Sequence, residues 1–147
     1  MKPFRFRLET LLEFRKTQKE QVQIAFLQSM NQLRIEKERL AELEAKLLDN
    51  VDLFHSRQKQ VLSIESFKTF RYYFDKISED VAGQKQRVVQ ADDHRRECLR
   101  NLTEAEKNYK VVEKFREKKF QDYQIEAMNE EQKLLDEIGL QIYTKDK

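Results

Sequence analysis

The chain of 147 residues contains only two glycines, one proline and one cysteine, and it has no tryptophan. Glycine and proline interrupt helices more than any other residues, so their scarcity predicts long continuous helices. A single cysteine excludes an intramolecular disulfide and favours a reducing compartment. Hydrophobic residues make up 39% of the chain and charged residues 38%, and the usual charged share is about 25%. This composition suits the narrow seam of a coiled coil better than a globular core.

Long hydrophobic runs are also missing. No segment approaches the roughly 20 apolar residues that a membrane-spanning helix needs. Lys2, Arg5 and Arg7 have no apolar stretch behind them, so they do not start a signal peptide. The 29 basic and 27 acidic residues nearly cancel, leaving a net charge of +2, and this balance argues against a nucleic-acid partner. We therefore expect a soluble cytoplasmic protein that does not insert into a membrane.

What the chain does have is a heptad repeat in two rows, offset by three residues, between Phe67 and Val112. The rows consist of Phe67, Phe74, Val81, Val88, Arg95, Leu102 and Tyr109, and of Phe70, Ile77, Gln84, Ala91, Cys98, Ala105 and Val112. All of them except Arg95 and Gln84 are apolar. Such a pattern predicts one apolar stripe on a helix that winds around a second helix with a left-handed supercoil.

A second stripe lies upstream. Its main row is formed by Phe26, Leu33, Leu40, Leu47 and Phe54. The companion row is formed by Met30, Lys37, Glu44 and Val51. Leu8, Leu11, Leu12 and Val22 are out of step with these rows, and a four-residue stutter would account for them.

The two stripes predict an all-α fold, a long antiparallel two-helix coiled-coil hairpin in a single rod over residues 1–147. The first helix is expected over residues 4–58, a turn with a short extra helix or overhang over 59–83, the second helix to about residue 140, and a tail over 141–147. Ser63 or Ser66 is expected to cap the second helix, and Gly139 to end it. Gly83 is expected to bend the helix rather than to stop it. Both termini should then lie together, away from the turn.

No catalytic, cofactor or metal site is expected. The only histidines are His55 and His94, and no glycine-rich loop or nucleophile elbow is present. His94 and Cys98 share a helical face, but two ligands from one helix are too few for a structural zinc site. Arg95 either snorkels out of the seam or pairs with a carboxylate across it, and Glu44 is its partner if the register allows.

Two surface features suggest protein contacts. Tyr72 and Tyr73 point away from the stripe near the turn, where adjacent aromatics either anchor a partner or are buried by a local fold-back. A basic cluster lies further along, formed by Lys110, Lys114, Arg116, Lys118 and Lys119. Glu113 and Glu117 alternate with it at spacings that allow helical ion pairs. A solvated face or a protein-docking patch is therefore favoured over nucleic-acid binding.

Three segments resemble the flagellar export protein FliJ family. The opening FRFRLETLLEFR, residues 4–15, is similar to that family's aromatic–basic alternation followed by a leucine pair. The stretch EKFREKK, residues 113–119, followed by Asp136-Glu137-Ile138, resembles its C-terminal pattern. The segment from Leu62 through Phe74 and Ile77 is similar to its tip. Together these similarities span essentially the whole chain.

The resemblance implies an antiparallel rod like the central stalk of rotary ATP synthases, without ATP chemistry of its own. Its implied partners are the flagellar export ATPase hexamer, the cytoplasmic domain of the export-gate membrane protein and export chaperones. When docked, such a rod lies at the cytoplasmic face of the inner membrane. Position along the rod assigns two ends. The ATPase-facing end is Phe4, Phe6, Leu8, Arg15, Arg116, Lys118 and Lys119, and the gate-facing tip is Phe54, Tyr72, Tyr73 and Ile77.

Two other functions fit the same sequence. One is the equivalent stalk of a virulence-type secretion system, which the residues do not separate from the flagellar one. The other is a self-associating structural tether, whose stripe would pair between two chains rather than within one. A nucleic-acid-binding rod is third, because the charges balance.

Overall fold

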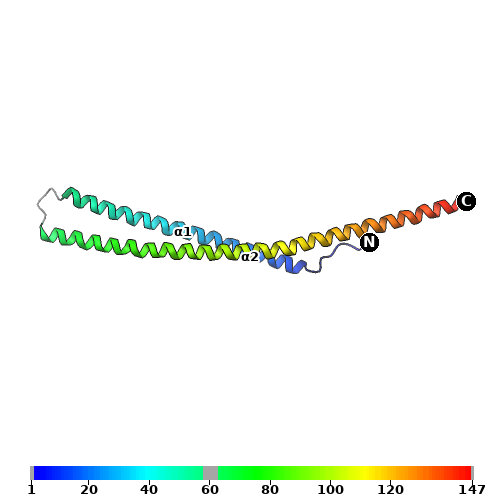
Figure 1. Ribbon diagram of the computed structural model, residues 1–147, viewed down its shortest axis with the longest axis horizontal. Coiled ribbons are helices and arrows are strands. Elements are labelled where there is room, and N and C mark those ends of the chain that lie inside the picture. The colour runs from blue at the N-terminus through cyan, green and yellow to red at the C-terminus, as the bar shows by residue number, and fades with distance from the viewer. Residues whose placement is uncertain (1, 58–62, 147) are drawn as a thin grey trace. The chain divides into compact units, whose positions relative to one another are not determined.

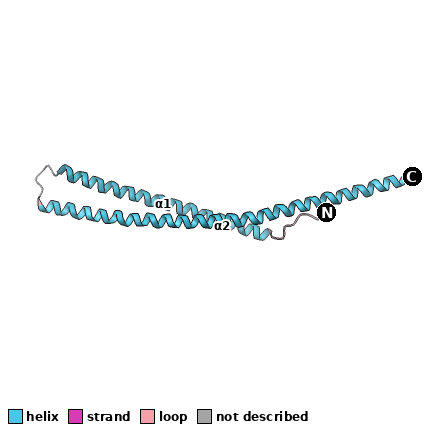
Figure 2. Ribbon diagram, viewed as in Figure 1, coloured by secondary structure: helices cyan, strands magenta, loops and turns pink. Residues whose placement is uncertain are grey.

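The computed structural model describes residues 2–57 and 63–146. These residues form an all-α helical hairpin of two helices, α1 (Glu9–Arg57) and α2 (Ile64–Lys145). Figure 2 shows helix and short loops but no strand in the described ranges. The fold class inferred from the heptad repeat is therefore confirmed. The first residues of the expected turn lie outside the described residues.

The hairpin divides into two compact units. One consists of residues 22–102, and the other combines the residues before 22 with those after 102. In the first unit the cyan part of α1 runs antiparallel to the green part of α2 (Figure 1). In the second unit the N-terminal residues lie against the later part of α2. Each unit thus brings together segments that are far apart in the sequence.

The apolar stripe of α2 forms the core that the heptad repeat predicts. The buried residues of the stripe are Val81, Gln84, Cys98, Ala105 and Val112. The remaining members of both rows are half-buried, except for Phe67, which is exposed. Arg95 is half-buried as well, so it does not break the stripe.

The companion row expected in α1 is wrong by one position. Met30 is 45% exposed, whereas the neighbouring Ser29 is only 3% exposed and Glu36 only 6% exposed. The true companion row follows Phe26 by three residues and includes Ser29, Glu36, Leu43 and Asn50, all buried or half-buried. The same spacing continues upstream through Arg15, Lys19 and Val22 without a stutter. Polar residues inside the seam concealed this row from a search for apolar periodicity.

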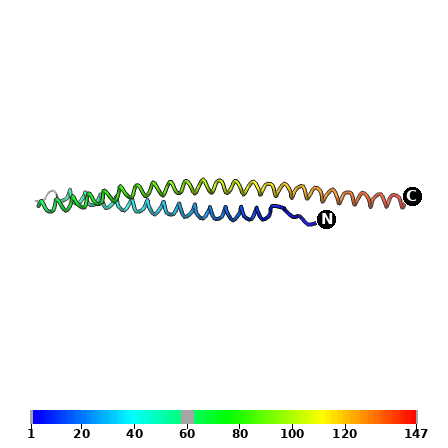
Figure 3. The backbone as a smooth tube through the Cα atoms, turned by 90° about the horizontal axis from the view of Figure 1, so that it is seen from below, coloured from blue at the N-terminus to red at the C-terminus, as the bar shows by residue number. Residues whose placement is uncertain are grey.

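The first helix begins at Glu9 rather than at residue 4. Residues 2–8 precede it as a non-helical segment, which Figure 3 shows as a smooth line ahead of the first coil. Hydrogen bonds from Glu9 N to Phe6 O (3.2 Å) and from Leu12 N to Leu8 O (2.9 Å) form the first turn. The aromatic side chains of this segment pack against α2, and those contacts replace the helical hydrogen bonds that the segment lacks.

The second helix is longer and simpler than expected. It begins at Ile64, where the Ser63 hydroxyl accepts a hydrogen bond from Ser66 N at 3.2 Å, so Ser63 is the N-cap. No separate short helix lies between Ser63 and Gly83, because α2 continues unbroken. Gly139 does not end the helix either, because α2 continues past it to Lys145. Gly139 has no positive φ, the backbone angle typical of a glycine that terminates a helix. The expected tail is helical to Lys145.

Gly83 offers a direct test of that continuity. A Cβ at this position would meet no atom within 4 Å, so Gly83→Ala should only improve helix propensity. We expect the free energy of unfolding to rise by about 0.5–1 kcal/mol, measured by urea titration followed by circular dichroism. Gly139→Ala is the matched control, because its surroundings are equally open but its part of α2 is exposed throughout. A lower stability of Gly83→Ala would contradict an unbroken helix there.

The pairing register places the surplus length at the C-terminal end of α2, not at the turn. Phe54 stacks on Phe70, with ring centroids 4.1 Å apart, close to the start of α2. In the other unit the Tyr123 hydroxyl donates to the carbonyl of Lys2 at 2.8 Å. Lys2 lies beside Tyr123, so residues 128–145 of α2 extend past it with every side chain exposed. The expectation that the two termini coincide is therefore wrong.

Candidate interaction surfaces

The compact unit formed by the residues before 22 and after 102 is called the terminal unit. It contains an aromatic cluster where the N-terminal segment lies on α2. The Phe4 ring lies 5.2 Å from that of Phe120 and 5.5 Å from that of Tyr123. The Phe6 ring lies 5.8 Å from that of Phe115. Such edge and tilted arrangements contribute about 0.5–1.5 kcal/mol each beyond area burial. Phe4 and Phe6, which the sequence assigned to the ATPase-facing end, thus hold the N-terminal segment on α2.

Basic side chains surround this cluster. Arg116 Nε pairs with Glu9 Oε2 at 2.9 Å, and its guanidinium lies 5.6 Å from the centre of the Phe4 ring. Lys119 Nζ lies 5.4 Å from the centre of the Phe115 ring. Arg116 and Lys119 therefore both make contacts with other side chains of this protein.

The other residues assigned to this end are less engaged. Lys118 is exposed, and Leu8 is at the border of exposure. Arg15 is half-buried, and its guanidinium donates to Gln18 Oε1 at 3.4 Å on the same helix. Both Leu8 and Lys119 help to line a cavity of about 640 Å³ beside the N-terminal segment, together with Phe6. All seven assigned residues lie in the terminal unit.

At the tip, the four residues assigned to the gate-facing surface divide into two kinds. Phe54 and Ile77 are half-buried seam residues, and the Phe54 ring stacks on Phe70 and also contacts Phe67. Tyr72 and Tyr73 are 65% and 54% exposed, with their rings edge to face at 6.1 Å. The fold-back that would have buried the two tyrosines does not occur, because residues 64–83 are part of α2.

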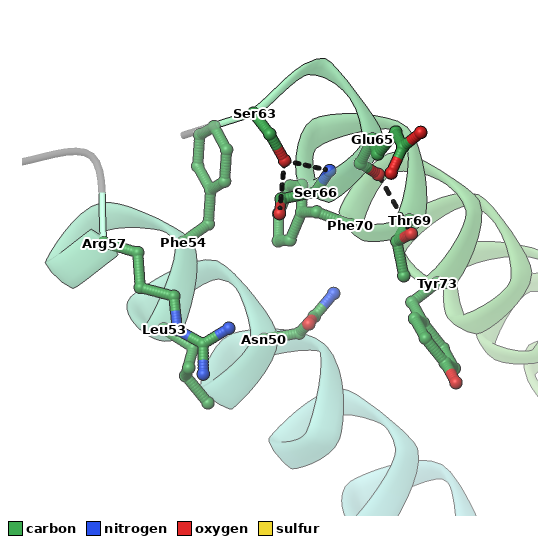
Figure 4. Close-up of a pocket in the computed structure, with 10 residues that line it drawn as sticks. All are labelled: Asn50, Leu53, Phe54, Arg57, Ser63, Glu65, Ser66, Thr69, Phe70 and Tyr73. Carbon is green, nitrogen blue, oxygen red and sulfur yellow. Dashed lines mark hydrogen bonds between the residues drawn. The ribbon is translucent and has the colours of Figure 1, made fainter. Parts of the chain in front are cut away.

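Beside Tyr73 lies a cavity of about 450 Å³ that the sequence did not indicate (Figure 4). The last turns of α1 contribute Asn50, Leu53, Phe54 and Arg57 to it, and α2 with its cap contributes Ser63, Glu65, Ser66, Thr69, Phe70 and Tyr73. The amide Nδ2 of Asn50 is buried and makes no hydrogen bond to any residue that the structure describes. Asn50 belongs to the companion row that apolar periodicity could not detect.

A buried polar layer crosses the seam in the same unit. Gln84, 5% exposed, donates from Nε2 to the backbone carbonyl of Glu36 at 2.9 Å and also to its carboxylate. Gln32 donates to the same carboxylate at 2.9 Å, and Arg39 lies 3.4 Å from it. In coiled coils such layers fix register at a cost in stability. The only advance signal was Gln84 as an exception in an apolar row.

Arg95 pairs along its own helix rather than across the seam. Its guanidinium contacts Asp92 at 3.0 and 3.2 Å, and Arg96 contacts the same carboxylate at 3.2 Å. The hydrogen bond from Arg95, with the charges of Arg96, Arg95 and Lys37, lowers the pKa of Asp92 below its ordinary value against the opposing effect of desolvation. Glu44 is exposed and is not the partner of Arg95.

Metal binding finds no support among the residues that the structure describes. His94 Nε2 and Cys98 Sγ lie 3.7 Å apart, but the described ranges contain no group of three or more metal-ligating side chains. No helix in those ranges is long and apolar enough to cross a membrane.

Comparison with known proteins identifies the family. The family described as flagellar FliJ protein matches residues 4–147. The chain belongs to the FliJ family. The family inferred from the sequence is thus confirmed, and membership makes the chain a component of flagellar export or the related type III secretion.

The fold has a solved counterpart. A candidate YscO homolog of Chlamydia trachomatis, CT670, has a TM-score of 0.66, with 97% of this chain and 96% of that chain covered at 18% identity. At this identity the likeness concerns the fold alone. No curated protein matches the sequence.

Proposed function

We propose that this FliJ protein is a non-enzymatic, stalk-like coupling and assembly factor of the flagellar export apparatus. In this proposal the terminal unit binds inside the export ATPase ring and the tip contacts the cytoplasmic domain of the export-gate protein. A ligand that binds only the assembled hexamer favours hexamer formation by mass action. Export chaperones are further proposed partners of the same surfaces.

The observation that carries the proposal is the separation of two different surfaces onto two compact units. One unit has the aromatic cluster of Phe4, Phe6 and their partners, ringed by basic side chains. The other has the exposed Tyr72–Tyr73 pair beside the tip cavity. Exposed adjacent aromatics are typical anchors of protein interfaces. Two separate anchor sites suit a factor that links two partners better than a tether that pairs with itself.

The fold likeness to a candidate YscO homolog supports the stalk of an injection-type secretion system as a second assignment. The family match over residues 4–147 favours the flagellar one. In either system the mechanism is the same: an asymmetric rod links nucleotide turnover in a ring to a membrane gate.

Substituting both tyrosines with alanine tests the tip. We expect Tyr72→Ala with Tyr73→Ala to weaken binding to the gate's cytoplasmic domain by roughly 10- to 100-fold, the range typical of aromatic hot spots. Stimulation of the ATPase should stay unchanged, because both tyrosines belong to the compact unit of residues 22–102 and the proposed ATPase surface belongs to the other. Isothermal titration and an ATPase assay on the same preparation give both readouts. Loss of both activities in a variant that is still helical would contradict separate surfaces.

A further inference from the structure

The outer face of α2 in the terminal unit carries a single row of lysines, the lysine row, formed by Lys107, Lys110, Lys114 and Lys118. Lys107 and Lys114 each follow a buried seam residue, Ala105 or Val112, by two positions. Two positions turn the side chain about 200° around the helix axis, so the row lies opposite the seam. All four lysines are exposed.

In the described residues the lysines of the row make no ion pairs. Glu113 and Glu117 lie three residues after Lys110 and Lys114, a spacing at which ion pairs form on helices. Yet in the described residues no lysine of the row lies within ion-pair distance of a carboxylate. The ion pairs expected from the sequence are therefore not made. Four exposed ammonium groups without an ion-pair partner in the described residues thus follow one another along about three turns of α2.

The shape of the row limits what can cover it. Glu104 borders it on one side, while Glu106, Glu113 and Glu117 border it on the other. A broad polyanion such as a nucleic-acid duplex would meet these carboxylates as well as the lysines. Val111, 63% exposed, adds an apolar contact next to the row, in a shallow cavity of about 380 Å³ that Lys107, Lys110 and Lys114 also line. A partner surface with a narrow row of acidic side chains and apolar residues beside it would match both the lysine row and Val111.

We propose that the lysine row is a docking surface for a helix of a partner protein that presents acidic side chains along one face. Glutamates spaced three and four residues apart on that helix would lie opposite the lysines at matching intervals. The apolar edge of the helix would cover Val111. The lysine row faces away from Phe120 and Tyr123 of the aromatic cluster, and the inference does not depend on the ATPase as a partner.

The test uses the full-length protein and a synthetic probe helix. The probe carries glutamates along one face at the spacing of the lysine row, and a second peptide has the same composition in scrambled order. Binding is followed by fluorescence anisotropy at low and physiological salt. We expect the ordered peptide to bind at least 10-fold more tightly than the scrambled one, with weaker binding at higher salt.

Matched variants separate the row from general electrostatics. Lys107→Gln, Lys110→Gln, Lys114→Gln and Lys118→Gln together should remove the preference, and arginine at the same four positions should retain it. Glutamine at Lys16, Lys46, Lys76 and Lys85 changes the net charge equally and should have little effect. Three results would overturn the proposal: equal binding of the two peptides, equal loss in both glutamine variants, or tighter binding of a 20-base-pair DNA duplex than of the ordered peptide.

Discussion

Replacing Gln84 with leucine is expected to lower the free energy of unfolding by about 2 kcal/mol, within a range of about 1–3 kcal/mol. The reason is the carboxylate of Glu36, which is buried in the seam and accepts hydrogen bonds from Gln84 and Gln32. Leucine removes one of these donors and adds apolar surface around a group that needs polar partners. Gln32 and Arg39 would remain, which keeps the loss below that of a fully unpaired charge.

The double replacement should reverse this loss. With leucine at both Glu36 and Gln84, this layer of the seam has no buried charge, and we expect stability equal to or above that of the natural protein. Urea titrations of the natural protein, both single variants and the double variant complete a mutant cycle. If Gln84→Leu alone were neutral, the polar layer would have no energetic role.

The polar layer should also influence association. Buried polar groups in coiled coils select one register and one partner, because a shifted pairing leaves them without hydrogen bonds. Analytical ultracentrifugation is expected to show the natural protein as a monomer and the double leucine variant as a mixture of monomer and dimer. A natural protein that is already a stable dimer would instead favour the self-associating tether.

Replacing both Phe4 and Phe6 with alanine is expected to reduce stimulation of the export ATPase by at least about 10-fold, the loss of a strong hot spot. The two rings hold the non-helical segment of residues 2–8 on α2 through Phe115, Phe120 and Tyr123. Without them the segment has the Tyr123–Lys2 hydrogen bond and the Arg116–Glu9 ion pair beside it. The surface proposed to enter the ring would then be lost.

Phe14 provides the matched control for this prediction. It is 60% exposed and takes part in no ring contact in the described residues, so Phe14→Ala should leave stimulation near the natural level. Circular dichroism should show unchanged helicity in both variants, because Phe4 and Phe6 precede α1 and alanine at position 14 favours the helix. Full stimulation by the Phe4/Phe6 variant would remove the aromatic cluster from the proposed ATPase surface.

The sequence predicted the fold because apolar periodicity is direct evidence of a helical seam. The two rows from Phe67 to Val112 predicted the stripe of α2, and Ser63 is one of the two serines expected to cap α2. The limits of the same method are visible in α1. Ser29, Glu36 and Asn50 occupy seam positions, and a polar residue at such a position looks like a surface residue until its partner is known. The companion row was therefore assigned one position too late.

The candidate surfaces show a similar division. The exposure of Tyr72 and Tyr73 follows from helical geometry once the stripe is known. Phe4 and Phe120 belong to two segments of the terminal unit that are far apart in the sequence. No local sequence pattern predicts that their rings pack together. The tip cavity depends on how α1 ends against the start of α2. Such long-range features require the pairing register, which the sequence left open.

The most direct test of the proposed function measures ATP hydrolysis and oligomeric state of the cognate export ATPase with and without an excess of this FliJ protein. The account predicts faster hydrolysis together with a larger hexamer fraction, because a ligand that binds only the ring stabilises the ring. Hydrolysis and hexamer fraction that both stay constant, while the added protein is soluble and helical, would contradict the stalk.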